Sequence, residues 1–390
     1  MRMMLRCNAP YDTAILSDAN GEVMRKWPDP LAALSWLSTE GRKHEWLGWI
    51  SYDLGRWFEA IPTFAKNDLD LPLFAFSTHA PPAATPDLQP HFARHGQVRA
   101  SSRATSADPG ESARFELCST FTRNAYERAV QRAIDYIGAG DVFQVNLSQR
   151  FSLPLRASSK TVYERLMARS PATYGALLEY SDFALICNSP ELFLRAAPDG
   201  RIITRPIKGT RPRLPGMDSE LLHSLKDQAE LNMIVDLERN DLGRVCEIGT
   251  VRVTEPRRIE AHPTVYHGVA TIEGTLRQDV NFLELLRATF PGGSITGAPK
   301  IRAMQIIEEL EPVRRGPYCG AIGYLATDGT IELNIAIRTM IAKDGLIHIP
   351  VGGGIVADSV PSEEYEETLV KAQAMFAAVD VAVGEMRDEK

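Results

Sequence analysis

The most unusual group of reactive side chains lies between Arg201 and Arg213, where five cations fall within thirteen residues. A solvated basic loop is the ordinary interpretation of such a run. The position of Lys208 favours a catalytic role instead, because it directly follows an apolar, strand-like segment and directly precedes Gly209 and Thr210. Glycine lets a ligand approach closely, and burial lowers the pKa of a lysine until its free amine is a nucleophile.

Two carboxylates, Asp227 and Glu230, lie three residues apart in the segment from Lys226 to Arg244. On a helix this spacing puts both side chains on one face, where they could hold a hard cation such as Mg2+. A solvated acidic face is the competing interpretation, and the spacing alone favours it.

A second acidic segment follows a triple glycine. Pro361 suits the first turn of a helix, on which Glu364, Glu367 and Lys371 would share one face, apart from an apolar stripe. The amides of the glycines can approach an anion closely because they carry no side chain. These glycines are Gly352, Gly353 and Gly354.

The segment from Pro291 to Arg302 is rich in glycine, but it lacks the Gly-Lys-Ser/Thr ending of a nucleotide-binding P-loop. We therefore do not expect ATP to bind through that motif. A glycine-rich turn into a helix can still offer amides and hydroxyls, that of Ser294 among them, to an anionic ligand.

Four single residues give weaker signals. By itself, His267 in VYHGVATI is more typical of a structural histidine, and Glu191 in NSPELFLR of a solvated carboxylate. Arg338, between apolar residues in NIAIRTM, needs an anionic partner if it is buried, either a protein carboxylate or a substrate carboxylate. Tyr318 has similar strand-like surroundings in PYCGAIGY.

The composition restricts the class of protein. A chain of 390 residues that is 44% hydrophobic is typical of a globular protein, and its formal net charge of −7 argues against general nucleic-acid binding. No apolar stretch is long enough to cross a membrane. The five cysteines are widely spaced and form no CxxC pair, which favours free thiols in a reducing, cytoplasmic compartment.

The elements that must position these residues follow no regular alternation of strand and helix. Helical spacing is clear after Thr122, and further helices are predicted at 219–238, 298–310 and 361–380. Strand-like segments are often adjacent, which favours an α+β fold with largely antiparallel sheets.

The chain divides by sequence into two regions. Residues 1–118 form an N-terminal region that we expect to pack into the same body as the rest. Proline, alanine and serine dominate residues 81–114, which predicts a mobile loop there. Residues 119–390 carry all the candidate residues named above.

Six motifs resemble those of the chorismate-utilising enzymes, in the same order: PIKGT, ELNMIVDLERNDLGRV, PGGSITGAPKIRAM, PYCGAIGY, NIAIRTM, and GGGIVADS followed by EYEETLVKA. The likeness is greatest to component I of the aminodeoxychorismate-forming branch, because anthranilate-forming relatives carry alanine inside the motif that holds Lys208. The residues Ile349, Pro350 and Val351 depart from the family pattern, which usually has a small residue before the first glycine.

The resemblance implies a mechanism. Lys208 would add to ring carbon 2 of chorismate and expel the carbon-4 hydroxyl, after which ammonia enters at carbon 4 and the lysine leaves. Glu191 would be the general acid/base for the departing hydroxyl.

The resemblance also implies a metal site and a substrate pocket. Glu230 and Glu367 would bind Mg2+ directly, with Glu364, and Asp227 as a further candidate, acting through water. The residues implied to bind the substrate are Gly209, Thr210, His267, Ser294, Tyr318, Arg338, Gly352, Gly353, Gly354 and Lys371.

The implied fold is a two-lobed sandwich of facing sheets with helices outside, and residues 119–390 would be its chorismate-binding catalytic region. The implied activity is the Mg2+-dependent conversion of chorismate and ammonia to 4-amino-4-deoxychorismate, in para-aminobenzoate and folate synthesis. A separate glutamine amidotransferase subunit would supply ammonia, since no cysteine has a glutaminase-like G-x-C-x-G context. The alternatives are anthranilate synthase component I, an isochorismate or salicylate synthase, and an inactive regulatory subunit.

Overall fold

The computed structural model describes residues 2–78, 97–98 and 117–381. Within these residues, twelve strands form the larger of two sheets, in the order β13-β15-β12-β11-β18-β17-β4-β5-β1-β2-β3, with β14 paired to β15. Their bounds are β1 (Met3–Cys7), β2 (Ala14–Asp18), β3 (Val23–Trp27), β4 (Trp46–Ile50), β5 (Phe74–Thr78), β11 (Leu192–Ala196), β12 (Arg201–Arg205), β13 (Ile207–Pro212), β14 (Arg252–Ala261), β15 (Val265–Thr275), β17 (Ala321–Leu325) and β18 (Ile331–Ile335).

The smaller sheet has eight strands in the described residues, in the order β16-β8-β20-β19-β10-β9-β6, with β7 paired to β8. Its strand pairs are antiparallel except that β6 runs parallel to β9. Their bounds are β6 (Gln97–Val98), β7 (Cys118–Ser119), β8 (Gln144–Pro154), β9 (Tyr174–Glu179), β10 (Phe183–Ser189), β16 (Gly297–Ala298), β19 (Thr339–Lys343) and β20 (Leu346–Ile355).

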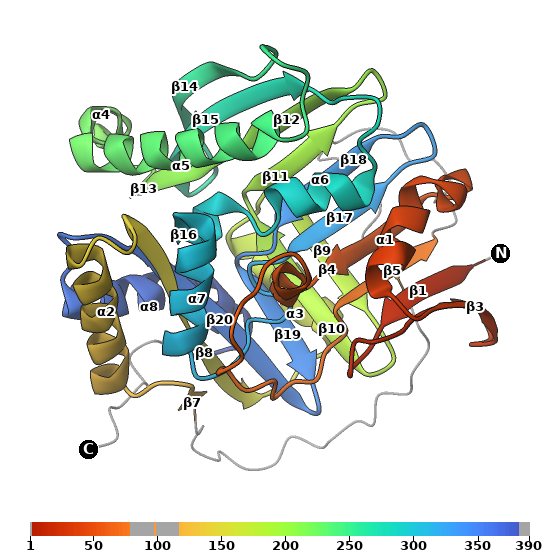
Figure 1. The fold of residues 1–390 in the computed structure, drawn as a ribbon. Coiled ribbons are helices and arrows are strands. Elements are labelled where there is room, and N and C mark those ends of the chain that lie inside the picture. Colours follow the sequence, from red (N-terminus) through yellow and green to blue (C-terminus); the bar gives the residue numbers. More distant parts are fainter. Residues whose placement is uncertain (1, 79–96, 99–116, 382–390) are drawn as a thin grey trace.

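The helices lie outside the two sheets (Figure 1). In that view α4 and α5 lie with β13, β14 and β15 in the upper part of the molecule, and α2, α7 and α8 lie below them beside β8. Their bounds are α1 (Pro30–Ser38), α2 (Arg123–Gly138), α3 (Ser159–Arg169), α4 (Met217–His223), α5 (Leu225–Gly243), α6 (Phe282–Thr289), α7 (Lys300–Leu310) and α8 (Pro361–Ala378). The predicted α+β architecture of facing, largely antiparallel sheets with outer helices is thereby confirmed.

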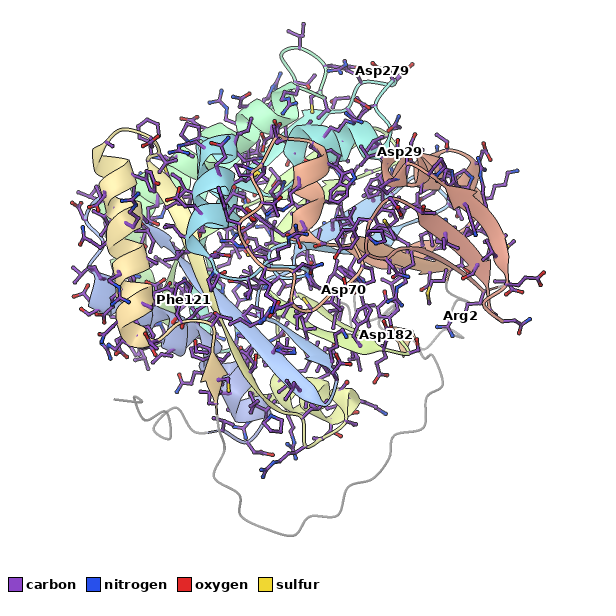
Figure 2. The ribbon with its side chains drawn as sticks, turned by 60° about the horizontal axis from the view of Figure 1, so that its bottom comes forward. Arg2, Asp29, Asp70, Phe121, Asp182 and Asp279 are labelled. Carbon is purple, nitrogen blue, oxygen red and sulfur yellow. The ribbon has the colours of Figure 1, made fainter. Side chains whose placement is uncertain are left out.

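Apolar side chains from both sheets form the core between them. Trp49 of β4 and Ile322 of β17 pack in one buried cluster with Tyr174, Leu178 and Phe183 from β9 and β10. Removing this apolar area from water is what holds the two sheets face to face. Figure 2 shows how side chains fill the space between the ribbons.

Local capping signals fix several helix ends. Thr122 accepts a hydrogen bond from the backbone of Ala125 and begins α2, where the sequence predicted helical spacing. Asp29, labelled in Figure 2, accepts one from Leu31 and begins α1. No helix in the described part of the chain is long and apolar enough to cross a membrane. All five cysteines are free.

One helix prediction is wrong, and one loop prediction lies mostly outside the described residues. The single helix predicted at 219–238 is wrong, because Ser224 adopts an extended conformation and separates α4 from α5. Its hydroxyl accepts a hydrogen bond from the Asp227 backbone, so a serine that could continue a helix begins a new one instead. The mobile loop predicted at 81–114 lies, except for residues 97–98, outside the described residues.

The strand β20 has different neighbours along its length. Strand β19 pairs with β20 only from Leu346 to His348, whereas β8 pairs with it from Leu346 to Ile355. The described part of β20 after His348 is therefore bonded on one side only. This arrangement tolerates Pro350, which has no backbone N–H to donate.

A buried ion pair ties the centre of β8 to the turn before β17. The carboxylate of Glu311 accepts hydrogen bonds from the Arg315 guanidinium and from the backbone and hydroxyl of Ser148. Arg315 also donates to the carbonyls of Ile295 and Asn146. Both side chains of the pair are almost fully buried, at 2% and 4% exposure.

We expect Glu311→Ala to lower the free energy of unfolding by about 3–5 kcal/mol, because it leaves the Arg315 charge buried without its partner. Denaturant titration followed by circular dichroism measures the change. The control is Glu164→Ala, which removes an exposed partner of Lys160 and should cost less than about 1 kcal/mol. Equal losses in the two variants would contradict the importance of the buried pair.

Candidate active site

The amine of Lys208 lies beside the glycine end of β20. A Cβ atom placed on Gly354 would be 3.2 Å from Lys208 Nζ and 3.0 Å from Gln144 Nε2. The three residues come from β13, β20 and β8, so strands of both sheets meet here. Only a residue without a side chain leaves room at Gly354 for both polar groups.

Burial lowers the pKa of Lys208, and the positive charge of Lys371 lowers it further. Carboxylates oppose the shift, first Glu230, then Glu191 and Glu367. A lysine with a lowered pKa holds a larger fraction of free amine near neutral pH, and the free amine is the nucleophilic form. Lys208 lies near the start of β13 and is partly buried, and its role as a nucleophile stays a prediction.

Glu191 lies just before β11 and is only 4% exposed. Burial raises the pKa of its carboxyl to about 7. The Ser294 hydroxyl, the Lys208 charge, the backbone of Ile207 and the Arg338 charge all oppose that rise. A carboxyl that titrates near neutral pH can both give and take a proton, which is what a general acid/base requires.

Two strands hold His267 in one orientation. Its Nδ1 lies 2.9 Å from the Thr210 hydroxyl, because Thr210 of β13 is the cross-strand partner of His267 of β15. Burial, with the Arg338 charge and His262, lowers the pKa of His267 to about 3. His267 is therefore neutral at physiological pH, and it can donate a hydrogen bond without adding charge to the site.

Arg338 has an unusual backbone conformation, with a φ of 48°. Burial lowers the pKa of its guanidinium, and the Glu191 charge opposes that shift. A half-buried arginine in a left-handed conformation is held there by its surroundings at some cost. Its charge faces Glu191 and His267, so it can serve an anionic ligand bound between them.

The position of Gly209 also requires glycine. Its φ is 83°, and a Cβ there would lie 2.6 Å from Leu221 and 2.9 Å from the Asp227 carboxylate. Asp227 forms an ion pair with Arg211 at 3.0 Å. The structure thus places Asp227 against β13, where it already has a cationic partner.

The acidic face predicted on α8 is present. A Cβ on Gly353 would be 3.1 Å from Glu364 Oε2, 3.5 Å from Glu367 Oε1 and 3.7 Å from Lys371 Nζ. Glu367 pairs with Lys371 at 2.6 Å, and this charge is the main cause that lowers the pKa of Glu367. Lys371 also donates to the Gly352 carbonyl.

These carboxylates supply some, but not all, of the ligands that a hard cation needs. Glu364 Oε2 is buried and has no hydrogen-bond partner in the described residues, although Oε1 accepts from Ser359. Glu230, half-buried on α5, and Glu367, on α8, each raise the pKa of Lys208, so both carboxylates face the same amine. Within the described residues, no three ligating side chains already form a complete metal cluster. An ion here would need oxygen ligands from water or substrate as well.

Tyr318 and Ser294 complete the residues predicted from sequence. Ser294 is 5% exposed, and its hydroxyl has no well-formed hydrogen bond among the described residues, though it acts on the nearby Glu191. Tyr318 is equally buried but lies in the turn beside Arg315 and Cys319. Within the described residues, Tyr318 forms no hydrogen bond with Lys208, so its place in a substrate pocket stays a prediction.

Sequence reasoning missed Gln144. It is fully buried, and both atoms of its side-chain amide lack hydrogen-bond partners among the described residues. A buried amide without partners is costly and marks a place where a small polar ligand can bind. A polar residue at the start of an apolar strand, in VFQVNL, was the signal available in the sequence.

Comparison with known proteins identifies the family of this chain. Residues 10–377 match the model of a family described as chorismate binding enzyme. Anthranilate synthase component 1 of Thermus thermophilus is 43% identical, covering 86% of this chain and 77% of that protein. Aminodeoxychorismate synthase component 1 of Bacillus subtilis is 37% identical, covering 94% and 85% respectively. The corresponding Escherichia coli protein is 40% identical, covering 86% and 76%.

The fold agrees with these relatives. The crystal structure of anthranilate synthase component I from Streptococcus pneumoniae superposes with a TM-score of 0.78 at 29% identity, covering 96% of this chain and 89% of that one. Relatives of both activities have similar identities to this chain, so overall similarity does not separate the two activities.

We expect Gly354→Ala to lower turnover with chorismate roughly 100-fold, because the added methyl group displaces Lys208 and Gln144 from each other. The melting temperature should change little, since both neighbours are side-chain ends. Gly138→Ala is the control, because a Cβ there meets nothing within 4 Å. Turnover in Gly354→Ala equal to that of the control would show that this contact is not part of the site.

Proposed function

This chain belongs to the chorismate-binding enzyme family, and we propose that it converts chorismate and ammonia to 4-amino-4-deoxychorismate. One observation carries the proposal. The amine of Lys208, with its pKa lowered by burial, lies next to the unpartnered amide of Gln144 at the glycine end of β20. The chain therefore has an amine nucleophile where an anthranilate-forming enzyme, by the resemblance of this motif, would have alanine.

The first step would be addition of the Lys208 amine to ring carbon 2 of chorismate. The carbon-4 hydroxyl leaves as water, taking a proton from the Glu191 carboxyl, whose pKa of about 7 suits this donation. Ammonia then forms a bond to carbon 4, Lys208 leaves carbon 2, and Glu191 takes up a proton again. The sum is loss of water and gain of ammonia at one carbon, with no change in oxidation state.

Gln144 suits the binding of ammonia better than the activation of water. Its amide can accept a hydrogen bond from ammonia or donate one, but an amide cannot remove a proton from water. Ammonia needs no such base, because it is a nucleophile as soon as it is neutral. The presence of Gln144 rather than a basic residue beside Lys208 thus favours an aminating reaction over the isomerisation to isochorismate, in which water enters at carbon 2 as the carbon-4 hydroxyl leaves.

The polar residues around Glu191 would bind the substrate anions. Arg338 would contact the enolpyruvyl carboxylate together with Tyr318, while His267 donates a hydrogen bond in its neutral form. The amides of Gly352, Gly353 and Gly354 would approach the ring carboxylate from β20.

Mg2+ would be held by Glu230 and Glu367, with Glu364 reached through water. The ion would supply a positive charge that neutralises the ring carboxylate among these glutamates. Asp227 already pairs with Arg211, as Glu367 does with Lys371, so either carboxylate would exchange a cationic partner for the ion.

Ammonia would come from a separate glutamine amidotransferase subunit or from ammonium salts. None of the five free cysteines lies in a glutaminase-like sequence, and four of them are buried. Burial raises the pKa of Cys7, Cys187, Cys246 and Cys319, which makes each a poor thiolate nucleophile. We expect this reaction to take place in the reducing cytoplasm, where such thiols stay free.

Anthranilate synthase component I is the second candidate, because the Thermus thermophilus relative of that name is 43% identical. The two activities differ in product. Anthranilate formation releases pyruvate, and aminodeoxychorismate formation retains the enolpyruvyl group. Mass spectrometry of the product formed from chorismate, Mg2+ and ammonium therefore decides between them.

We expect Lys208→Ala to abolish most aminodeoxychorismate formation while the protein keeps its fold, since the variant lacks the amine that begins the reaction. Product mass and a thermal melt measure the two effects. Lys160→Ala, an exposed lysine on α3, is the matched control and should behave as the unaltered enzyme. Full activity in Lys208→Ala, or anthranilate and pyruvate from the unaltered enzyme, would refute the proposal.

We also expect excess chelator to stop turnover and Mg2+ to restore it, because the substrate carboxylate would otherwise meet several glutamates without a compensating charge. Glu367→Gln should weaken the response to Mg2+, and the measured quantity is the Mg2+ concentration for half-maximal rate. The metal role is wrong if turnover continues unchanged in chelator.

A further inference from the structure

The corner between α4 and α5, residues 221–227, has no helix breaker in its sequence. From Met217 to Leu231 the chain contains neither glycine nor proline, so local propensity favours one continuous helix. The main chain nevertheless turns at Ser224, whose hydroxyl caps the start of α5. A serine hydroxyl can also bond within a helix, so it does not enforce the break by itself. Contacts from other parts of the fold must maintain the corner.

Arg211 of β13 bridges the two helices. Its Nε donates a 2.8 Å hydrogen bond to Glu220 of α4, and its Nη2 donates one of 3.0 Å to Asp227 of α5. Its Nη1 donates to the carbonyl of Thr210 on its own strand at 3.0 Å. Every nitrogen of the guanidinium thus has an oxygen partner, and the planar fork fixes the three directions relative to each other.

Arg257 of β14 holds the same corner from a second strand. Its Nη1 donates a 3.2 Å hydrogen bond to the carbonyl of Ser224, and its Nη2 donates to the carbonyl of Leu221. Both β13 and β14 pair with β15, so the two arginines reach the corner from one part of the larger sheet, on which α4 and α5 lie (Figure 1). The sheet therefore fixes the main chain at the break.

The corner lies directly against the residue that follows Lys208. A Cβ on Gly209 would be 2.6 Å from Leu221 and 2.9 Å from the Asp227 carboxylate. One turn after Asp227, Glu230 lies on the same face of α5. Through Asp227, Arg211 thus connects the strand that carries Lys208 to the first turns of the helix that carries Glu230.

Electrostatic repulsion gives such a tie a purpose. Burial raises the pKa of Glu230, and the charge of Glu367 on α8 raises it further, although Lys208 opposes the rise. The carboxylates of α5 and α8 therefore repel each other before an ion binds between them. Without a tie to the sheet, this repulsion favours movement of the start of α5 away from α8.

Asp227 and Glu367 differ in what their ion pairs connect. Glu367 and Lys371 lie one turn apart on a single helix, so exchanging that pair for an ion detaches no element. Asp227 and Arg211 join a helix to a strand, and both are largely shielded from solvent, at 16% and 26% exposure. Exchanging this second pair for an ion would release the start of α5.

We propose that Arg211 and Asp227 form a clasp that positions α5, and with it Glu230, opposite the carboxylates of α8. Both are positioning residues. Asp227 keeps its arginine partner when an ion binds, and neither residue contacts the ion or the substrate. The inference rests on the proposed metal role of Glu230 and Glu367.

The sign of one substitution separates a clasp from a metal ligand. If Asp227 acted on the ion through water, replacing Arg211 by an uncharged residue would free that carboxylate and remove a nearby positive charge. Mg2+ would then bind more tightly. If the pair is a clasp, the same replacement releases the start of α5, and Mg2+ binds more weakly although a positive charge is gone.

The test compares Arg211→Met, Asp227→Asn and the double variant. Mn2+ is the probe, and electron paramagnetic resonance measures its dissociation constant without ammonia, so that no turnover is needed. We expect each single variant to weaken Mn2+ binding about tenfold, as the loss of a group that orients a metal ligand does. The double variant should bind no more weakly than the single ones, because both substitutions break the same clasp.

Two further variants serve as controls. Arg211→Lys keeps the charge but cannot bond both helices in the fixed geometry of the fork, so it should also weaken Mn2+ binding. Arg258→Met removes an exposed arginine of β14 that pairs with Glu255, and it should leave Mn2+ binding unchanged. Circular dichroism checks that each variant is folded.

Mn2+ binding that is tighter or unchanged in Arg211→Met would overturn the clasp, and so would losses that add up in the double variant. Failure of the proposed reaction has a different signature. Anthranilate as the product, or full activity of Lys208→Ala, would leave these binding measurements as they are. An unaltered enzyme that binds no Mn2+ would overturn the metal role and the clasp together.

Discussion

The pairing of β8 with β20 is the constraint on which the candidate site depends. It runs without a register shift from Leu346 opposite Pro154 to Ile355 opposite Val145. Because side chains alternate between the two faces of a strand, a slip of one residue would turn Gln144 away from Gly354. The same register brings the glycines of β20 over the acidic face of α8. Fixing one strand pair thus fixes the amide, the glycines and the carboxylates relative to each other.

Burial shifts the pKa values of the two main ionisable groups of the site in opposite directions. Burial lowers the pKa of Lys208 and raises that of Glu191, although each group's charge favours the ionised form of the other. Desolvation is the larger effect in both cases. A protonated Glu191 carboxyl and a neutral Lys208 amine can therefore coexist near neutral pH, whereas both groups would be ionised in water. Helix α5 packs against β13 and β15 and covers this part of the site.

Much of the fold and part of the site could be predicted from the sequence. Lys208 and Glu191 were found because each belongs to a motif with a recognisable pattern, and the facing antiparallel sheets followed from adjacent strand-like segments. The break at Ser224 was not predicted, since a serine hydroxyl that caps a helix looks the same in sequence as one within it. Gln144 was missed because its importance lies in the hydrogen-bond partners that its amide lacks, and that depends on tertiary packing alone.

The one-sided pairing of β20 after His348 bears on how this protein avoids aggregation. A strand with an unpaired edge is usually a liability, because its free N–H and C=O groups can add a strand from another molecule. Here the unpaired edge belongs to the segment that holds the glycines beside Lys208, and its residues Ile349, Pro350 and Val351 are buried. Pro350 removes one donor from that edge, and the Lys371 amine occupies the carbonyl of Gly352. The protein can thus keep backbone groups available at its centre without offering a template for intermolecular β-sheet.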